Sequence, residues 1–439
     1  MILFLIGVAA FTFFRLNVRS KLRSRIDAIR AAGYPVTCAE LDQWYTIPED
    51  AENAAYTITD AFSCYIEPQD ATLVPIVGQA KLPPRKEPLA EEIKAAVAGY
   101  IADNKKALEL LHAGTAIENC RYPVDLSAGA EATFHDLSRL KKGARLLSLE
   151  ALSHADSDPN LAVRSIVSAF GLARSLESEP TLISQLVRIA CQGLAVSSLG
   201  QLMNRTNFED EQLVNLSEAV LEARAPSAMS RAFVGERCMY LTTLSVSPME
   251  IARLISDEPD SVLEANLTNL AFTLHRLAGL TDRSTIIYLD LMEEYIEAAQ
   301  LPFNERREAF EVIDARCREV WRKDFVLPHL MRAIKRSNEI SLRCIAHLRA
   351  AQTVIAVQRY RLATGELPDA LADLVPTYLE AVPKDPFDGN ELRYKKLEPG
   401  FVVYSVGEDL SDDGGQERLP PKERRSGTPN WDVTFIVER

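Results

Sequence analysis

Apolar residues at helical spacing extend almost without a break from Leu89 to about Ser337, and they constrain the fold more than any other feature. Asp158-Pro159 is an N-cap followed by a proline at the first helical position. The helix after it carries one apolar stripe of Val163, Ile166, Val167, Phe170 and Ala173. Amphipathic helices bury such stripes against one another, and short polar turns make sequence neighbours antiparallel. The sequence therefore predicts a mainly α fold, an irregular helical bundle or α-solenoid, over residues 89–336.

Two segments in this region, 136–155 and 160–176, weakly resemble a tetratricopeptide hairpin. Pro180 ends the pair, and the small residues that carry the likeness are Ala144, Ala151, Ala162, Ala169 and Ala173. The helix pair is longer than the usual repeat of about 34 residues, and no strict period recurs. We therefore expect an irregular solenoid with a groove for a peptide or a protein partner.

The N-terminal segment Met1 to Phe14 is almost wholly apolar, and basic residues follow from Arg15 onward. A membrane-spanning helix needs about 20 apolar residues, so this run is short unless Arg15 snorkels and Leu16 and Val18 extend it. Three interpretations are open. The one we favour is a membrane anchor over residues 1–18. The second is a signal-peptide core, for which the basic n-region and cleavage site are missing. The third is the first buried helix of a soluble protein.

Composition limits the classes of partner. The formal net charge of -13 and the isoelectric point near 5.2 argue against a nucleic-acid binder, which needs a basic surface. Neither a P-loop nor a GxGxxG motif occurs, so we expect no nucleotide site. The seven cysteines form no CxxC pair and the histidines lack metal-ligand spacing, so we expect no zinc site. Three cysteines inside helical apolar patterns are predicted to be buried thiols: Cys191, Cys317 and Cys344.

Several charges interrupt the apolar helix faces: Arg188, Glu236-Arg237 and Glu293-Glu294. One interpretation is paired carboxylates for acid–base catalysis, as in a glycosidase. The other, which we favour, is a set of structural ion pairs that join helices. The stretch Arg121 to Asp125 is expected to be a turn with a local Arg–Asp contact. No GxSxG elbow for a serine nucleophile occurs.

The C-terminal part changes character. A helix that starts near Ser337 is expected to end at Gly365, because glycine is a common helix stop. Asp385-Pro386 and Asp388-Gly389 indicate turns. Alternating residues predict strands at 391–396 and 401–406, with a hairpin turn at 398–400, and a last strand at 431–437.

This order of elements resembles the globular domain of type II secretion pseudopilins. The family pattern is a helix, a Leu/Tyr-Pro step, a Pro-x-Asp-Pro-aromatic turn, a Tyr-bearing strand, Tyr-Ser-Leu-Gly-x-Asp and a late Asn-Trp. In this chain the matching residues are Leu367-Pro368, Val382-Pro383-Lys384-Asp385-Pro386-Phe387, Tyr394, Tyr404-Ser405-Val406-Gly407-Glu408-Asp409 and Asn430-Trp431. The resemblance covers roughly the last 100 residues.

Major pseudopilins hold calcium in the loop after the Tyr-Ser-Leu-Gly-x-Asp motif. The resemblance therefore implies a calcium site at Asp409, with Asp412 and Asp413 in the following loop. Carboxylate and backbone oxygens are suitable calcium ligands. The alternative is a solvated acidic loop that turns at Gly414-Gly415. Leu410 replaces the usual glycine, and the insertion 419–427 lengthens the loop.

The resemblance also bears on organisation and location. In a pseudopilin the membrane segment leads directly into the helix of the globular domain, whereas here some 320 residues intervene. We therefore do not expect a fibre subunit. The resemblance places the body outside the cytoplasm, whereas the basic residues after the apolar run predict that it stays inside. A start upstream of Met1 would resolve that conflict.

We expect four parts: a membrane anchor (1–18), a basic helix and Pro-rich connector (19–88), an all-helical domain (89–336) and a pseudopilin-like α+β domain (337–439). The leading functional hypothesis is a membrane-anchored, extracytoplasmic structural or interaction protein of the cell envelope. Its protein partners would include components of type II secretion-like assemblies. The alternative is a hydrolase or a small-ligand-binding protein with its site in the helical domain. The sequence favours a protein that is not an enzyme.

Overall fold

The computed structural model describes residues 1–134, 136–245, 273, 277–321, 327–417 and 431–439. The chain is mainly helical, as predicted, with few strands. The helices are α1 (Ile2–Ala31), α2 (Cys38–Trp44), α3 (Ala54–Ser63), α4 (Glu91–Asp103), α5 (Lys105–Thr115), α6 (Leu137–His154), α7 (Pro159–Arg174), α8 (Leu182–Arg205), α9 (Asp210–Glu222), α10 (Ala228–Ser245), α13 (Leu280–Ala298), α14 (Phe303–Trp321) and α15 (Leu327–Thr364). The strands are β1 (Arg393–Lys396), β2 (Phe401–Ser405) and β3 (Val433–Val437), and the short 3-10 helices are η1 (Leu126–Glu131) and η2 (Leu371–Leu374).

Local capping explains where many helices begin. The Asp158 carboxylate accepts the backbone N–H of Leu161 at 3.1 Å, with Pro159 at the first helical position of α7. Thr37 caps α2 by accepting from Glu40 N at 3.2 Å. Each cap satisfies a backbone donor that has no partner within the helix.

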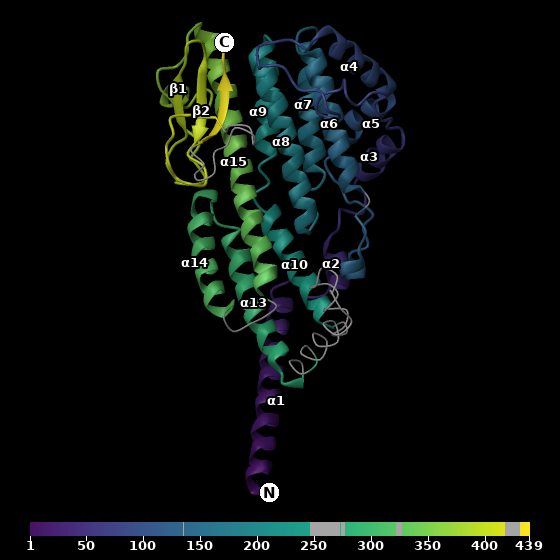
Figure 1. Ribbon diagram of the computed structural model, residues 1–439, viewed down its shortest axis with the longest axis vertical. Helices are drawn as coiled ribbons and strands as arrows, with labels where there is room; N and C mark the ends of the chain where they lie inside the picture. Colours follow the sequence, from purple (N-terminus) through teal and green to yellow (C-terminus); the bar gives the residue numbers. More distant parts are fainter. Residues whose placement is uncertain (135, 246–272, 274–276, 322–326, 418–430) are drawn as a thin grey trace.

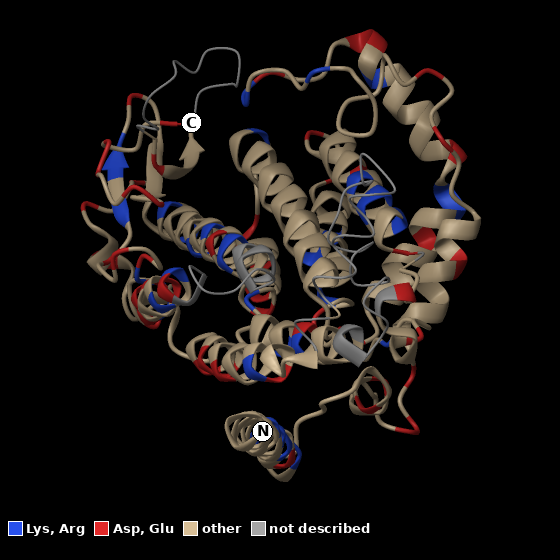
Figure 2. Ribbon diagram, turned by 60° about the horizontal axis from the view of Figure 1, so that its bottom comes forward, with Lys and Arg blue, Asp and Glu red and all other residues tan. Residues whose placement is uncertain are grey.

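The helices from α4 to α10 pack in an order that follows the sequence. Within this body α6 packs on α7 and α8, while α7 packs on α8 and α9. Next-but-one contacts also join α5 to α7 and α8 to α10. This pattern places α5, α7 and α9 in one layer, as expected for a solenoid-like body. Figure 2 shows Lys and Arg positions interspersed with Asp and Glu positions along the helices.

The long helix α15 joins the body to the sheet. It packs against α8 and α9 as well as against β2 and β3 (Figure 1). One hydrophobic core extends from the helical body through α15 into the sheet. Its fully buried residues include Leu199 of α8, Val354 of α15 and Phe401 of β2. The predicted boundary between residues 336 and 337 therefore falls inside one continuous helix.

The sheet is antiparallel in the order β1-β2-β3. Central strand β2 is buried along its whole length, and Val403 pairs with Tyr394 on one side and with Phe435 on the other. Gly400 has φ +96 in the turn between β1 and β2, a conformation that glycine adopts without steric cost. The three predicted strands are present: β1 and β3 start two residues later than predicted, and β2 ends one residue earlier. The insertion 419–427 lies outside the described residues.

Helix α1 extends from the body at the end opposite the sheet (Figure 1). Its later part packs on α13, where Arg25 contacts Asp290 at 2.9 Å and also pairs with Glu293. Among the residues that the structure describes, three helices are long and apolar enough to cross a membrane. The apolar windows of α8 and α15 are 67% and 72% buried within the protein, whereas that of α1 is only 6% buried. The interpretation of the N-terminus as a buried helix is therefore wrong.

Candidate functional site

The predicted calcium residues lie in an ordered loop after β2. Asp409 is exposed and accepts from Ser411 N at 3.1 Å. Asp412 accepts from the Tyr404 hydroxyl at 3.0 Å, whereas Asp413 contributes its backbone N–H to Asp432. Within the described ranges, no three His, Cys, Asp or Glu side chains are grouped so that they could hold a metal ion. The calcium site stays a prediction.

A further acid of this loop was missed by the sequence reasoning. Asp432 is 2% exposed, and its carboxylate accepts backbone N–H groups from Gly415 at 2.7 Å and from Asp413 at 3.4 Å. Burial raises the pKa of Asp432, and the hydrogen bonds oppose that rise. This carboxylate joins the backbone at Asp413 and Gly415 to the residue just before β3, which is a structural role.

The adjacent carboxylates Glu293 and Glu294 do not form an acid–base pair. Glu293 pairs with Arg25 of α1, whereas Glu294 pairs with Arg316 of α14 at 2.6 Å. Glu236 accepts Leu182 N at 3.1 Å and so caps the start of α8. The structural interpretation of the two neighbouring glutamates is confirmed, because each one joins α13 to a different helix.

Two other predicted sites are structural in a different way from the one expected. Arg121 contacts Asp42 at 3.1 Å and not the expected Asp125, because helix α2, which carries Asp42, lies beside residue 121. Arg188 is 3% exposed and donates to the Gln185 side chain at 2.5 Å and to the Ala223 carbonyl at 3.4 Å. Cys191, Cys317 and Cys344 are buried free thiols, as predicted.

The most distinctive polar arrangement in the helical body joins α5, α6 and α7. The His112 Nδ1 atom lies 2.7 Å from the Ser168 hydroxyl, and its Nε2 atom lies 2.8 Å from the Glu150 carboxylate. Ser165 donates to the same Glu150 oxygen at 2.7 Å. We call His112, Glu150, Ser165 and Ser168 the polar cluster. His112, Glu150 and Ser168 are between 6% and 7% exposed, so their hydrogen bonds are sheltered from water.

Close approach of two helices makes this contact possible. Gly171 of α7 faces Thr115 of α5, and a Cβ on that glycine would lie 2.9 Å from the Thr115 carbonyl oxygen. The missing side chain lets α5 and α7 pack closely enough for His112 to reach Ser168. The short turn of the α6–α7 hairpin places Glu150 beside Ser165. Local sequence thus builds the helices, and their packing brings the side chains together.

The chemistry of the side chains determines which atoms of the polar cluster donate hydrogen bonds and which accept them. A carboxylate only accepts hydrogen bonds, so with a neutral imidazole the His112 Nε2 atom carries the proton that Glu150 accepts. The Nδ1 atom is then an acceptor, and Ser168 donates to it. Such an order of carboxylate, imidazole and hydroxyl is that of a serine nucleophile with a general base.

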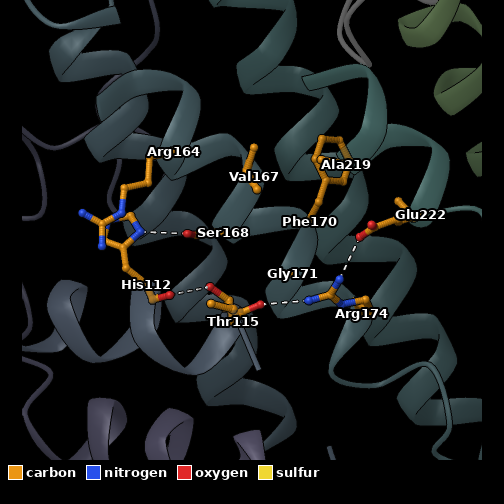
Figure 3. A pocket seen from close by; sticks show the side chains of 12 residues that line it. His112, Thr115, Arg164, Val167, Ser168, Phe170, Gly171, Arg174, Ala219 and Glu222 are labelled. Atoms are coloured by element: carbon orange, nitrogen blue, oxygen red, sulfur yellow. Dashed lines mark hydrogen bonds and ion pairs between the residues drawn. The ribbon is translucent and has the colours of Figure 1, made fainter. Parts of the chain in front are cut away.

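The polar cluster opens on a pocket of about 290 Å³ (Figure 3). Its floor is one face of α7, with Arg164 at one end and Arg174 at the other, where Arg174 pairs with Glu222 at 2.7 Å. His112 and Arg164 also line an adjoining hollow of about 420 Å³. Arg174 and Glu222 also line another hollow, of about 800 Å³. The three hollows are neighbours because they share lining residues, and we call them together the groove over α7.

Two chemical uses fit this geometry. As a structural element, the polar cluster satisfies buried polar groups and fixes the register of three helices. As a reactive element, Ser168 is positioned for nucleophilic attack. The backbone N–H groups near Ser168 are used within α7, so a developing negative oxygen would need a side-chain donor. Arg164, one turn earlier on α7 and exposed, is a cation that lines the same pocket as Ser168.

Sequence reasoning missed every member of the polar cluster. His112 and Ser168 are separated by 56 positions and belong to no motif. The one signal was Glu150, a charged residue inside the apolar run of α6.

Comparisons with protein-family models, curated proteins and solved structures find no match to this chain. The class that the fold itself defines is a mainly helical protein with an N-terminal apolar helix that is compatible with membrane association.

Proposed function

We propose that this chain is a membrane-anchored protein of the cell envelope that binds protein partners. The observation that carries the proposal is the exposed apolar part of α1. Leu3, Phe4 and Phe13 are 86%, 74% and 73% exposed. Removing such a side chain from water contributes about 1.5–3 kcal/mol. Ten large apolar side chains between Ile2 and Leu16 are exposed, so this part of α1 is strongly favoured to enter a bilayer.

The groove over α7 supports the interaction role. It combines apolar surface with charges of both signs, as do surfaces that bind proteins. The pseudopilin resemblance supports a more specific partner, a component of a type II secretion-like assembly, and an orientation in which the body lies outside the cytoplasm. The α15 helix that leads into a three-stranded antiparallel sheet has the order of elements that the resemblance implies.

Membrane fractionation of the full-length protein tests the anchor. We expect the protein to remain in the membrane pellet after alkaline carbonate washing. The double variant Ile6→Lys and Phe11→Lys should be released, because each lysine in a spanning helix costs about 2.5–3.5 kcal/mol. Leu221→Lys, an exposed position of α9 at 42%, is the matched control and should stay in the pellet. A wild-type protein found in the soluble fraction would refute the anchor.

The side of the membrane needs a separate measurement. A reporter that is active only outside the cytoplasm, fused after Arg439, should be active. Activity of only the cytoplasmic reporter would contradict the outward orientation and leave the anchor unaffected.

A second candidate function is supported by the polar cluster, namely an ester or amide hydrolase. Ser168 Oγ would attack the carbonyl carbon while its proton passes to His112 Nδ1. The leaving group would take that proton as the acyl bond breaks, and water would then release the acyl group by the same route. Arg164 would face the negative oxygen.

Covalent labelling by a fluorophosphonate and hydrolysis of p-nitrophenyl acetate test this candidate. Labelling should occur at Ser168 and disappear in Ser168→Ala, and His112→Ala should abolish hydrolysis. Ser165→Ala is the matched control, because it removes a hydroxyl that bonds to the same Glu150 oxygen but leaves the nucleophile. Absence of labelling in the wild-type protein would assign the cluster a purely structural role.

A further inference from the structure

Three arginines from distant parts of the chain lie together in the folded protein. Arg224 follows the end of α9, Arg306 is in the first turn of α14, and Arg349 is within α15. Helix α15 packs against both α9 and α14 (Figure 1), which brings the three positions into one region. We call Arg224, Arg306 and Arg349 the arginine cluster.

Contacts with Phe303 and Pro226 hold the arginine cluster together. The Arg306 guanidinium lies 4.2 Å from the centre of the Phe303 ring, and the Arg349 guanidinium lies 5.3 Å from the same centre. Arg306 also donates to the Pro226 carbonyl at 2.8 Å, two residues from Arg224. These contacts fix the turn after α9 against the start of α14, so Arg224 is held beside the other two arginines.

Backbone carbonyls, and not carboxylates, accept the hydrogen bonds that these side chains make. Arg306 donates to the carbonyl oxygens of Leu301 and Pro226, both at 2.8 Å. Arg349 donates to the Lys384 carbonyl. A carbonyl orients a guanidinium group but carries no formal charge, so these contacts leave the positive charges uncompensated.

Arg224 is the least compensated of the three. Within the described residues its side chain makes no hydrogen bond and no ion pair, and its Nε atom is buried without a partner. Glu222, two residues earlier, pairs instead with Arg174 at 2.7 Å. Burial alone lowers the pKa of Arg224. The residue is half-buried, and a partly buried charge of this kind is costly unless a partner is supplied.

One acid acts on the arginine cluster, and its charge is already shared. Asp385 raises the pKa of Arg349, but burial and the positive charge of Arg224 lower that pKa to about 10. Burial and the nearby Arg349 likewise lower the pKa of Arg306 to about 10. The fully buried Asp385 carboxylate also pairs with Arg393 at 2.8 Å. Three guanidinium groups against one carboxylate leave an excess of two positive charges, even before Arg393 is counted.

We propose that the arginine cluster binds a phosphate group, either free or carried on an organic molecule. The group contacts Arg224 and Arg349, which are half-buried and keep N–H donors without acceptors in the described residues. Arg306 is 2% exposed, so it fixes the turn and adds positive potential. The guanidinium fork matches phosphate geometry. A phosphate group carries nearly two negative charges at pH 7, which balances the excess, whereas a carboxylate brings one. The proposal does not rest on membrane anchoring or on the polar cluster.

Isothermal titration of the full-length protein at fixed ionic strength tests the proposal with inorganic phosphate, phenyl phosphate and acetate. At least one phosphate probe should bind tenfold or more tightly than acetate. Binding of inorganic phosphate alone supports a site for the free ion, and binding of phenyl phosphate as well supports a site for a phosphate carried on an organic molecule. Binding of neither phosphate probe, or acetate binding of equal strength, would overturn the proposal.

Variants locate the binding. Arg224→Gln and Arg349→Gln should each weaken binding of the phosphate probe at least tenfold, since hydrogen bonds to charged groups are strong. Arg343→Gln is the matched control, because it removes a cation of α15 that pairs with Glu408 at 2.6 Å, and it should bind within twofold of the wild type. Arg224 makes no hydrogen bond within the described residues, so its replacement should leave the fold intact. Unchanged binding in the folded Arg224 or Arg349 variant would refute the assignment.

Discussion

The buried carboxyl of Glu179 gives a quantitative test of the packing between α7 and α8. Its side chain is 1% exposed. Ser184 donates to one carboxyl oxygen at 2.7 Å, whereas the other oxygen has no hydrogen-bond partner in the described part of the chain. Burial raises the pKa of Glu179 to about 7, against the opposing effect of the Ser184 hydrogen bond. We predict that Glu179→Gln removes a large pH dependence of stability.

The sign and size follow from proton linkage. In the unfolded chain the carboxyl has its usual pKa of 4.5, and folding raises it to about 7. The carboxyl's contribution to the free energy of unfolding is fully present below about pH 4.5 and is lost as the pH rises through about 7. The reason is that the unfolded chain gives up its proton easily above pH 4.5, whereas the folded protein must hold the charged carboxylate in a buried site. At 1.36 kcal/mol per unit of pH the whole loss is about 3 kcal/mol, of which about 2.5 kcal/mol falls between pH 5 and pH 8.

Thermal unfolding of the full-length protein at pH 5 and pH 8 measures this effect. For 439 residues, the typical unfolding entropy makes 2.5 kcal/mol equal to a Tm change of about 3 °C. Glutamine keeps the acceptor for Ser184 and has the shape of the protonated acid. We therefore expect Tm(Gln) minus Tm(wild type) to be about 3 °C larger at pH 8 than at pH 5.

The control is Glu308→Gln, which makes the same charge change at an exposed position of α14. Its difference from the wild type should be the same at both pH values. If Glu179→Gln also runs parallel to the wild type between pH 5 and pH 8, the carboxyl is not buried as the structure has it, and the reasoning fails.

Two further predictions concern a helix contact and the acidic loop. A Cβ on Gly235 would overlap the Pro180 carbonyl oxygen, whereas a Cβ on Gly193 meets nothing within 4 Å. Gly235→Ala should therefore lower the free energy of unfolding by more than 2 kcal/mol and Gly193→Ala should raise it by about 0.5–1 kcal/mol, and equal urea midpoints would contradict the close contact. Calcium should raise the Tm of the wild type but not that of Asp409→Ala, if the loop binds the ion as the resemblance implies. Absence of a calcium effect in the wild type would remove the ion site.

The polar cluster lay beyond sequence reasoning for a physical reason. His112, Glu150 and Ser168 come from three different helices, α5, α6 and α7. No local pattern states which helices touch or at what angle. The contact of Arg121 with Asp42, instead of the expected local partner, has the same origin.

The sequence by itself determined the elements. Helical periodicity, the Asp158-Pro159 start and the glycine stop at Gly365 depend on interactions within a few residues, so they can be seen without the fold. The apolar run of α1 is equally local. Only the tertiary structure decided which polar groups meet, because side chains far apart in sequence come together through the packing of complete helices. Gly171 is an example. Its lack of a side chain matters only because α5 packs against it in the folded protein, and the local sequence does not show that contact.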